Sequence, residues 1–212
     1  MLALGILGLG ASGLAGCGRE TVFVPAGQRA GNLLGNADFP MRLVGNGPRY
    51  FGVRSAMIDG LESGVRLLST TDYHLTGLKF RNIAGPAVDV RAAGNGYHHA
   101  GFLSQIAVAH SYCGFRFSDK AEYETVSDCN AAYCVFGFDI GSGNNSFSNC
   151  KVVNCSVGVR ISGGSNNAHG FWNGLMANHC EINLLCEDVT NGEHFAGSCF
   201  IGGVADHQGK IA

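Results

Sequence analysis

The sequence predicts an all-β fold, a single-stranded right-handed parallel β-helix of about seven to eight rungs that spans residues 21–212. Two observations carry this prediction. A strand-like segment recurs at steps of 21 to 27 residues, and glycine is abundant, at 33 of 212 residues, whereas proline is scarce, at 4. Many short strands joined by tight turns account for this composition, because glycine tolerates the backbone conformations of sharp turns.

The internal repeat is clearest between residues 124–140 and 145–161, which align with an offset of 21 residues. Identical residues coincide in this alignment, among them Cys129 with Cys150, Cys134 with Cys155, Gly137 with Gly158, and Ile140 with Ile161. Periods of about 20–50 residues are typical of solenoids, propellers and arrays. The unit is too short for a four-stranded propeller blade and has no helical periodicity. Stacked β coils are therefore expected.

Each repeat is predicted to contain two strands. Six inward positions of the second strand are expected to share one column: Val65, Val88, Phe115, Phe138, Val159 and Leu184. The glycine or asparagine that opens this strand is assigned to a corner with a left-handed backbone. In the first strand, Trp172 shares the column of Val126 and Phe147, which favours an interior aromatic stack over a sugar-binding role.

The nine cysteines are interpreted as reduced core residues rather than as a disulfide framework. Two inward columns are expected, one of Cys129, Cys150 and Cys199 with Leu78, Ile106 and Leu175, the other of Cys134, Cys155 and Cys180 with Ala84 and Ser111. Side chains in one column run parallel, which is poor disulfide geometry. Reduced cysteines fit a protein that is folded in a reducing cytosol.

Residues 1–20 are expected to cap the open end of the solenoid, as terminal segments do in this architecture. Leu14–Cys17 matches a bacterial lipoprotein cleavage box. That reading is disfavoured, because no Lys or Arg precedes Cys17 and the segment is glycine-rich.

Composition and spacing exclude several classes of function. The net charge is −2 and Lys and Arg are not clustered, so neither a nucleic-acid partner nor a membrane partner is expected. No Cys/His spacing resembles a zinc site, and no phosphate-binding loop or nucleophile elbow occurs. We therefore expect no metal and no cofactor.

The middle residues of the second strands alternate in charge, in the order Arg66, Asp89, Arg116, Asp139, Arg160 and then Leu185. We interpret this outward column as a structural charge ladder. Catalysis by Asp89 and Asp139 is disfavoured, because Arg116 between them is expected to keep both ionised.

Two longer connections supply the candidate site. The turn 118–124 carries Asp119, Glu122 and Glu124, which are candidate acid and base groups; the alternative is a solvated acidic turn. The loop 91–101 carries Tyr97, His98 and His99, which are candidate sugar-binding residues; the alternative is a plain glycine-rich turn. Both connections follow consecutive second strands, so we expect them to lie one above the other at one corner.

The segment Thr21–Gly27 resembles the opening strand of pectate-lyase-like β-helix proteins, and residues 167–200 are similar to bacteriophage tail-spike β-helices. The resemblance implies a homotrimer of a phage tail, assembled in the host cytoplasm, that binds and in some cases depolymerises a bacterial surface polysaccharide. An enzyme of this kind is a polysaccharide hydrolase or lyase, but the chain carries no catalytic motif of the family. The alternatives are a non-catalytic structural or adhesive β-helix of a virion and an exported pectate-lyase-like enzyme or lipoprotein.

Overall fold

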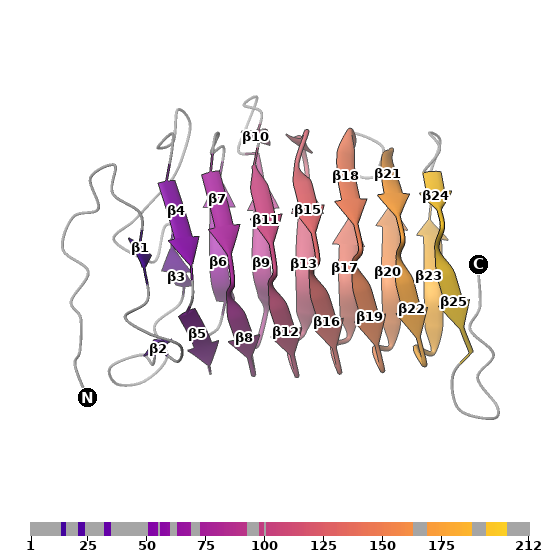
Figure 1. Ribbon diagram of the computed structural model, residues 1–212, viewed down its shortest axis with the longest axis horizontal. Helices are drawn as coiled ribbons and strands as arrows, with labels where there is room; N and C mark the ends of the chain where they lie inside the picture. The colour runs from indigo at the N-terminus through magenta and orange to yellow at the C-terminus, as the bar shows by residue number, and fades with distance from the viewer. Residues whose placement is uncertain are drawn as a thin grey trace.

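The chain folds as a solenoid of parallel β-strands, and the computed structural model shows its coils stacked side by side from one end to the other (Figure 1). The structure describes residues 14–15, 21–23, 32–34, 51–54, 56–59, 63–68, 73–92, 98–99, 101–162, 169–187 and 194–202. Among these residues there is no helix. The predicted all-β parallel β-helix is confirmed, while its right-handed sense stays a prediction.

Three parallel sheets run along the solenoid, and we name them A, B and C. Sheet A contains β1 (Leu14–Ala15), β4 (Phe51–Arg54), β7 (Tyr73–Thr76), β11 (Phe102–Ser104), β15 (Thr125–Ser127), β18 (Asn145–Ser148), β21 (Gly170–Asn173) and β24 (His194–Ala196). Sheet B contains β2 (Thr21–Phe23), β5 (Ala56–Asp59), β8 (Lys79–Arg81), β12 (Ala107–Ala109), β16 (Asn130–Ala132), β19 (Lys151–Val153), β22 (Met176–Asn178) and β25 (Cys199–Ile201). Sheet C contains β3 (Asn32–Leu34), β6 (Ser63–Leu68), β9 (Pro86–Arg91), β13 (Cys113–Ser118), β17 (Phe136–Ile140), β20 (Val157–Ser162) and β23 (Ile182–Glu187). Two further strands, β10 (His98–His99) and β14 (Ala121–Glu122), pair with each other.

Sheets A and B have eight strands each and sheet C has seven, but the structure shows only about five full turns, fewer than the seven to eight rungs expected. Five consecutive coils, from β7 to β23, have three strands each with their side chains described. Of residues 1–20, the structure describes β1, which pairs with β4 in sheet A. The rest of the expected capping segment, including Cys17, lies outside the described residues.

The expectation of two strands per repeat is wrong, because the run predicted as one first strand bends into two. In the coil that begins at Tyr73, Thr76 ends β7 and Lys79 begins β8, with Gly77 at a φ of 66° between them. In the later coils this corner is held by Gln105, Asp128 and Asn149, at φ of 54°, 53° and 51°. A side chain that tolerates the left-handed region thus turns the chain from sheet A into sheet B.

The glycines that open the sheet C strands have a different role from the one expected. Gly114 and Gly137 have no positive φ. A Cβ on Gly114 would lie 2.5 Å from the carbonyl oxygen of Gly137 and 2.8 Å from Cβ of Ala131. Glycine is required there because the inner face of sheet B packs directly against the backbone of sheet C.

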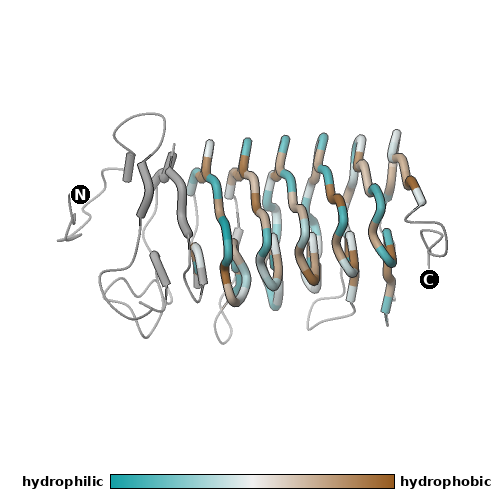
Figure 2. The backbone as a smooth tube through the Cα atoms, turned by 90° about the horizontal axis from the view of Figure 1, so that it is seen from below, coloured by the Kyte–Doolittle hydropathy of each residue, from teal (hydrophilic) through white to brown (hydrophobic). Residues whose placement is uncertain are grey.

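The core lies inside the three sheets, and the predicted inward column of sheet C is confirmed. Val65 pairs with Val88, and the register continues through Phe115, Phe138, Val159 and Leu184, all of them buried. Hydrophobic and hydrophilic stretches follow one another along the coils that Figure 2 draws in colour. The predicted interior position of Trp172 is also confirmed: its ring is fully buried and stacks on Phe147 at 3.9 Å between ring centroids.

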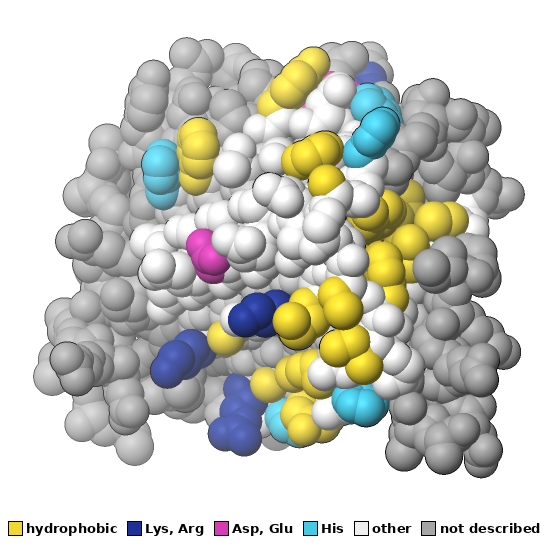
Figure 3. Space-filling model, turned by 45° about the vertical axis from the view of Figure 1, so that its right-hand side comes forward, with side chains coloured by type: hydrophobic (Ala, Val, Ile, Leu, Met, Phe, Trp, Pro, Cys, Tyr) yellow, Lys and Arg dark blue, Asp and Glu magenta, His cyan; other side chains and the backbone are white. Residues whose placement is uncertain are grey.

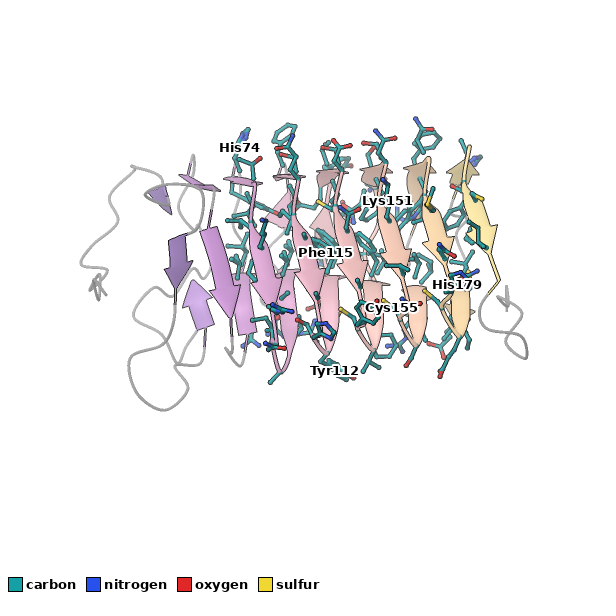
Figure 4. All side chains as sticks on the ribbon, turned by 60° about the horizontal axis from the view of Figure 1, so that its bottom comes forward. His74, Tyr112, Phe115, Lys151, Cys155 and His179 are labelled. Atoms are coloured by element: carbon teal, nitrogen blue, oxygen red, sulfur yellow. The ribbon has the colours of Figure 1, made fainter. Side chains whose placement is uncertain are left out.

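Five cysteines lie at corners of the coil, where their thiols bond to the backbone: Cys129, Cys134, Cys150, Cys155 and Cys180. Cys129 and Cys150 donate to the carbonyl oxygens of Ser127 and Ser148, two residues earlier, at 3.3 and 3.5 Å. Cys134 and Cys155, the latter labelled in Figure 4, repeat this bond at the next corner. Each thiol therefore fills a small apolar space and satisfies a carbonyl at the turn. The eight described cysteines are free.

Two members of the expected cysteine columns are wrong. The pairing of Arg81 with Ala109 places Ile83, which is buried, in the column of Ser111, whereas Ala84 is exposed. Cys199 pairs with Met176 on the outer face of sheet B and is exposed. A shift of one residue in register moves a side chain to the opposite face of a strand, and this accounts for both errors.

Candidate functional site

The corner at which the chain passes from sheet C to sheet A, here called the C–A corner, brings the two predicted loops together. His98 pairs with Ala121 and His99 pairs with Glu122, through the parallel strands β10 and β14. The expectation that loop 91–101 lies beside turn 118–124 is therefore confirmed for the backbone. Tyr97 lies outside the described residues, and of His98 and His99 the structure describes only the backbone.

The three predicted carboxylates have different surroundings. Asp119 is exposed, at a φ of 58°. Glu122 is buried, and Glu124 is completely buried. The alternative of a solvated acidic turn is thus wrong for both glutamates. The chain forms β14 here instead of a loop, and Tyr123, which is 61% exposed, points outward between them.

Glu124 is part of the interior of the solenoid. Its Oε2 accepts a hydrogen bond of 2.8 Å from the Tyr73 hydroxyl, and its backbone N–H donates to Oδ1 of Asn145 at 2.9 Å. Burial, and then the charge and hydrogen bond of Glu124, raise the pKa of Tyr73 well above its usual 10. A Cβ on Gly101 would collide with both Glu124 and Tyr73, so glycine leaves room for this pair. This geometry gives Glu124 a structural role.

Glu122 belongs to a line of polar groups that follows the C–A corner across successive coils. Asn144 donates from Nδ2 to Oε2 of Glu122 at 3.4 Å. Oδ1 of Asn144 lies 3.0 Å from Nε2 of His169, so the imidazole is the donor at this nitrogen. Gly143 lies directly against the His169 ring, where a Cβ would not fit. This Glu122–Asn144–His169 line can orient a carboxylate at the edge of sheet A.

Sequence reasoning missed Asn144 and His169 as site residues. Asn144 aligns with Tyr123 at the 21-residue offset, so the repeat could have placed it at the same corner as Glu122. His169 lies two residues before the strand residue Phe171 and follows a connection that the 21-residue repeat does not cover.

The outer face of sheet A borders this corner, and it carries two rows of uncharged polar or aromatic side chains. The pairing of the strands from β7 to β24 defines the first row as His74, Phe102, Thr125, Ser146, Phe171 and His194. The second row is Thr76, Ser104, Ser127, Ser148, Asn173 and Ala196. From β7 to β24 neither row contains Asp, Glu, Lys or Arg; beyond β7 the second row continues to Arg54, which pairs with Thr76. The alternation of outward and inward residues in each strand could have identified these rows from the sequence.

Two aromatic rings stand on this face among hydroxyl groups. Phe102 is 48% exposed and Phe171 is 46% exposed. The ring of Phe102 stacks on His74, which Figure 4 labels, at 4.9 Å and 24°. In the second row, the hydroxyls of Thr76 and Ser104 are 2.8 Å apart and hydrogen-bonded. Figure 3 shows a broad area of other side chains and backbone, with His side chains next to hydrophobic ones at its edges and a few charged side chains within and below it.

A second group of exposed aromatic residues lies on the opposite side, at the corner between sheets B and C, here called the B–C corner. His110 stacks on Tyr133 at 4.9 Å and 4°. Tyr112, labelled in Figure 4, contacts the edge of Phe136, and the Arg160 guanidinium lies 5.5 Å from the centre of the Phe136 ring. Here the aromatic rings contact one another rather than standing in rows of hydroxyls.

The predicted charge ladder of sheet C is confirmed in its register but is uneven in its bonding. Asp89 lies in the expected outward column, but it is completely buried and contacts Arg66 at 2.9 Å, Arg116 at 2.9 Å and Arg91 at 3.3 Å. Arg116 directs both of its hydrogen bonds to Asp89. Asp139 keeps a longer contact of 3.6 Å with Arg160. Burial raises the pKa of Asp139, against the opposing charges of its arginine neighbours.

Within the part of the chain that the structure describes, no group of three or more His, Cys, Asp or Glu side chains is arranged to hold a metal ion. In the same part, no helix is long and apolar enough to cross a membrane. The chain matches no protein-family model, and it matches no curated protein.

Proposed function

We propose that the chain binds an extended bacterial surface polysaccharide along the outer face of sheet A, as a tail-spike-like module of a phage. One observation carries this proposal: two exposed aromatic rings, Phe102 and Phe171, stand in a continuous uncharged face of hydroxyl and amide side chains. Sugars present the same combination, because their rings have apolar C–H faces and hydroxyl edges.

The geometry of the face suits a polymer rather than a small ligand. A parallel sheet presents equivalent side chains every ~4.8 Å, close to the length of one sugar unit. Aromatic rings provide apolar contact area, and serine and threonine hydroxyls both donate and accept hydrogen bonds. A flat row of such groups can follow a sugar chain over several units.

The B–C corner is a weaker candidate for sugar binding. The neighbouring outer positions of sheet B include Ala109, Ala132 and Val153, which offer no hydroxyl groups. Such a surface favours contact with protein.

The first prediction concerns affinity. Replacing Phe171 by Ala should weaken binding of a recognised polysaccharide about tenfold, because losing a stacked ring costs about 1.4 kcal/mol of binding free energy. Tyr133→Ala, at the B–C corner, is the control, because it also removes an exposed aromatic ring. Titration against immobilised bacterial capsules measures both. Equal losses in the two variants, or no loss in either, would place the binding face elsewhere.

Cleavage of the polysaccharide is a second candidate function. Glu122 lies at the border of the sheet A face, and its strand pairs with the strand of His98 and His99. Asn144 hydrogen-bonds to Glu122, and His169 hydrogen-bonds to Asn144. In this proposal Glu122 acts as the acid or base of a hydrolase or lyase, and Asp119 is the second carboxylate. Tyr97, His98 and His99 stay candidates for holding the sugar.

The second prediction tests cleavage. Glu122→Gln should lower the rate of polysaccharide depolymerisation by roughly two orders of magnitude or more, because it removes the proton-transfer group while keeping its shape. Glu124→Gln, which sequence reasoning grouped with it, should instead affect stability, because Glu124 is bound to Tyr73 in the interior. Loss of polymer molecular weight is the measurement. If the wild-type protein binds the polymer but does not shorten it, the cleavage proposal is wrong and the chain is a binding module.

The homotrimer and the location in a phage virion are also parts of this proposal. They rest on the resemblance described above. The competing proposals are a purely adhesive β-helix and an exported pectate-lyase-like enzyme.

A further inference from the structure

We propose that the sheet A face recognises a neutral oligosaccharide segment in which two rings, three sugar units apart, stack on Phe102 and Phe171. This inference rests on the proposed polysaccharide binding and adds to it the charge class of the ligand and the spacing of its contacts.

The spacing follows from the register of sheet A. Phe102 pairs with Thr125, Thr125 with Ser146, and Ser146 with Phe171. The two phenylalanines are therefore three strands apart, or ~14 Å at ~4.8 Å per strand. Since one sugar unit is about as long as one strand spacing, a chain that lies along the solenoid axis places its first and fourth rings on the two aromatic rings.

The side chains between the phenylalanines support this arrangement. Thr125 and Ser146 are much smaller than Phe102 and Phe171, so side chains at the two middle positions project less far from the sheet than those at the two ends of the segment. Ser127 and Ser148 lie beside them in the second row. Four hydroxyl groups are thus available to the two middle sugars, while the aromatic rings cover the outer two.

Histidines lie next to both aromatic rings, at the outer ends of the segment. His74 stacks on Phe102 and supports its ring from one side. His194 pairs with Phe171 in the strand register. Because each phenylalanine has a neighbouring ring on the side away from Thr125 and Ser146, the binding segment has the same pattern when it is read from either end.

The charges around the face favour a neutral ligand. Between Phe102 and Phe171 neither row contains Asp, Glu, Lys, Arg or His, so an acidic sugar finds no cationic side chain in this segment to compensate its charge. Asp128 is exposed at the border beside Ser127, and Glu122 lies at the opposite border. Lys120, on the same corner as Glu122, already has an interaction of its own. The exposed carboxylate of Asp128 repels the uronic or sialic acids of an acidic polysaccharide that lies over this segment.

A length series tests the spacing. A panel of bacterial capsular and O-polysaccharides is cut by partial hydrolysis into fragments from disaccharide to hexasaccharide, and their affinities are measured by calorimetry. We expect affinity to rise about tenfold from trisaccharide to tetrasaccharide, where the second aromatic contact becomes reachable, and to level off afterwards. The step should vanish in Phe102→Ala and in Phe171→Ala, and should persist in the control Tyr133→Ala.

A chemical comparison tests the charge. Acidic capsules are used in native form and after reduction of their uronic carboxyl groups to alcohols, which removes the charge but keeps the sugar chain. We expect the reduced form to bind about tenfold more tightly or better. Equal binding of both forms, or an affinity that rises smoothly with length in all variants, overturns this inference and leaves polysaccharide binding in place. Absence of binding to every native and reduced polymer overturns the proposed function itself.

Discussion

Replacing Asp89 by Ala should lower the free energy of unfolding by roughly 3–5 kcal/mol, the cost of breaking a buried ion pair by removing one partner. Asp89 is completely buried beneath Arg66, Arg91 and Arg116, whose side chains are 20%, 31% and 28% exposed. Without the carboxylate, three guanidinium groups face one another with no compensating charge. Their partial exposure lets water solvate them in part, which keeps the loss within this range.

Asp139→Ala is the matched control, because Asp139 occupies the same column one coil beyond Arg116. Its side chain is 18% exposed, and its closest arginine contact is 3.6 Å. We expect it to cost about 1 kcal/mol or less, as partly exposed ion pairs do. Urea unfolding followed by circular dichroism measures both variants. Similar losses of unfolding free energy in the two variants would mean that Asp89 stabilises the protein no more than Asp139 does.

The repeat predicted the fold well, because the inward columns are set by hydrophobic residues that recur at nearly constant steps. The column from Val65 to Leu184 and the interior position of Trp172 follow from spacing alone. The third sheet did not follow, because Gln105, Asp128 and Asn149 turn the chain without the glycine or proline that usually marks a corner. A strand that bends at such residues looks continuous in the sequence.

The candidate site was predicted in its location but not in its burial. The pairing of His99 with Glu122 follows from two loops at equivalent points of successive coils. The interior position of Glu124 does not, since its partner Tyr73 is 51 residues earlier in the chain. The sheet A face was also missed, because each of its residues is unremarkable in one strand, and the two rows form only when the strands are stacked.

The second large effect concerns alkaline pH. Burial is the main cause that raises the pKa of the thiols of Cys113, Cys129 and Cys150, in the last case to about 12. In the unfolded chain a thiol titrates near ~8.5. The folded state therefore keeps protons that the unfolded state loses. The stability from these groups is fully present below about pH 8.5 and is lost as the pH rises toward the folded pKa values.

We expect the free energy of unfolding to be constant from about pH 7 to 8 and then to fall by about 1.4 kcal/mol per pH unit for each buried thiol. Near pH 10 the three thiols together remove about 6 kcal/mol, comparable to the whole stability of many domains. Urea titrations with a phosphine reductant, which prevents oxidation, measure the slope.

Cys150→Ala is the control: it should be less stable at neutral pH, because a carbonyl loses its thiol donor and a small cavity forms. Above about pH 9 its stability should decline less steeply than that of the wild-type protein, by the contribution of one thiol. If the two slopes are the same, the Cys150 thiol is not protected from ionisation, and its position in a closed core column is wrong.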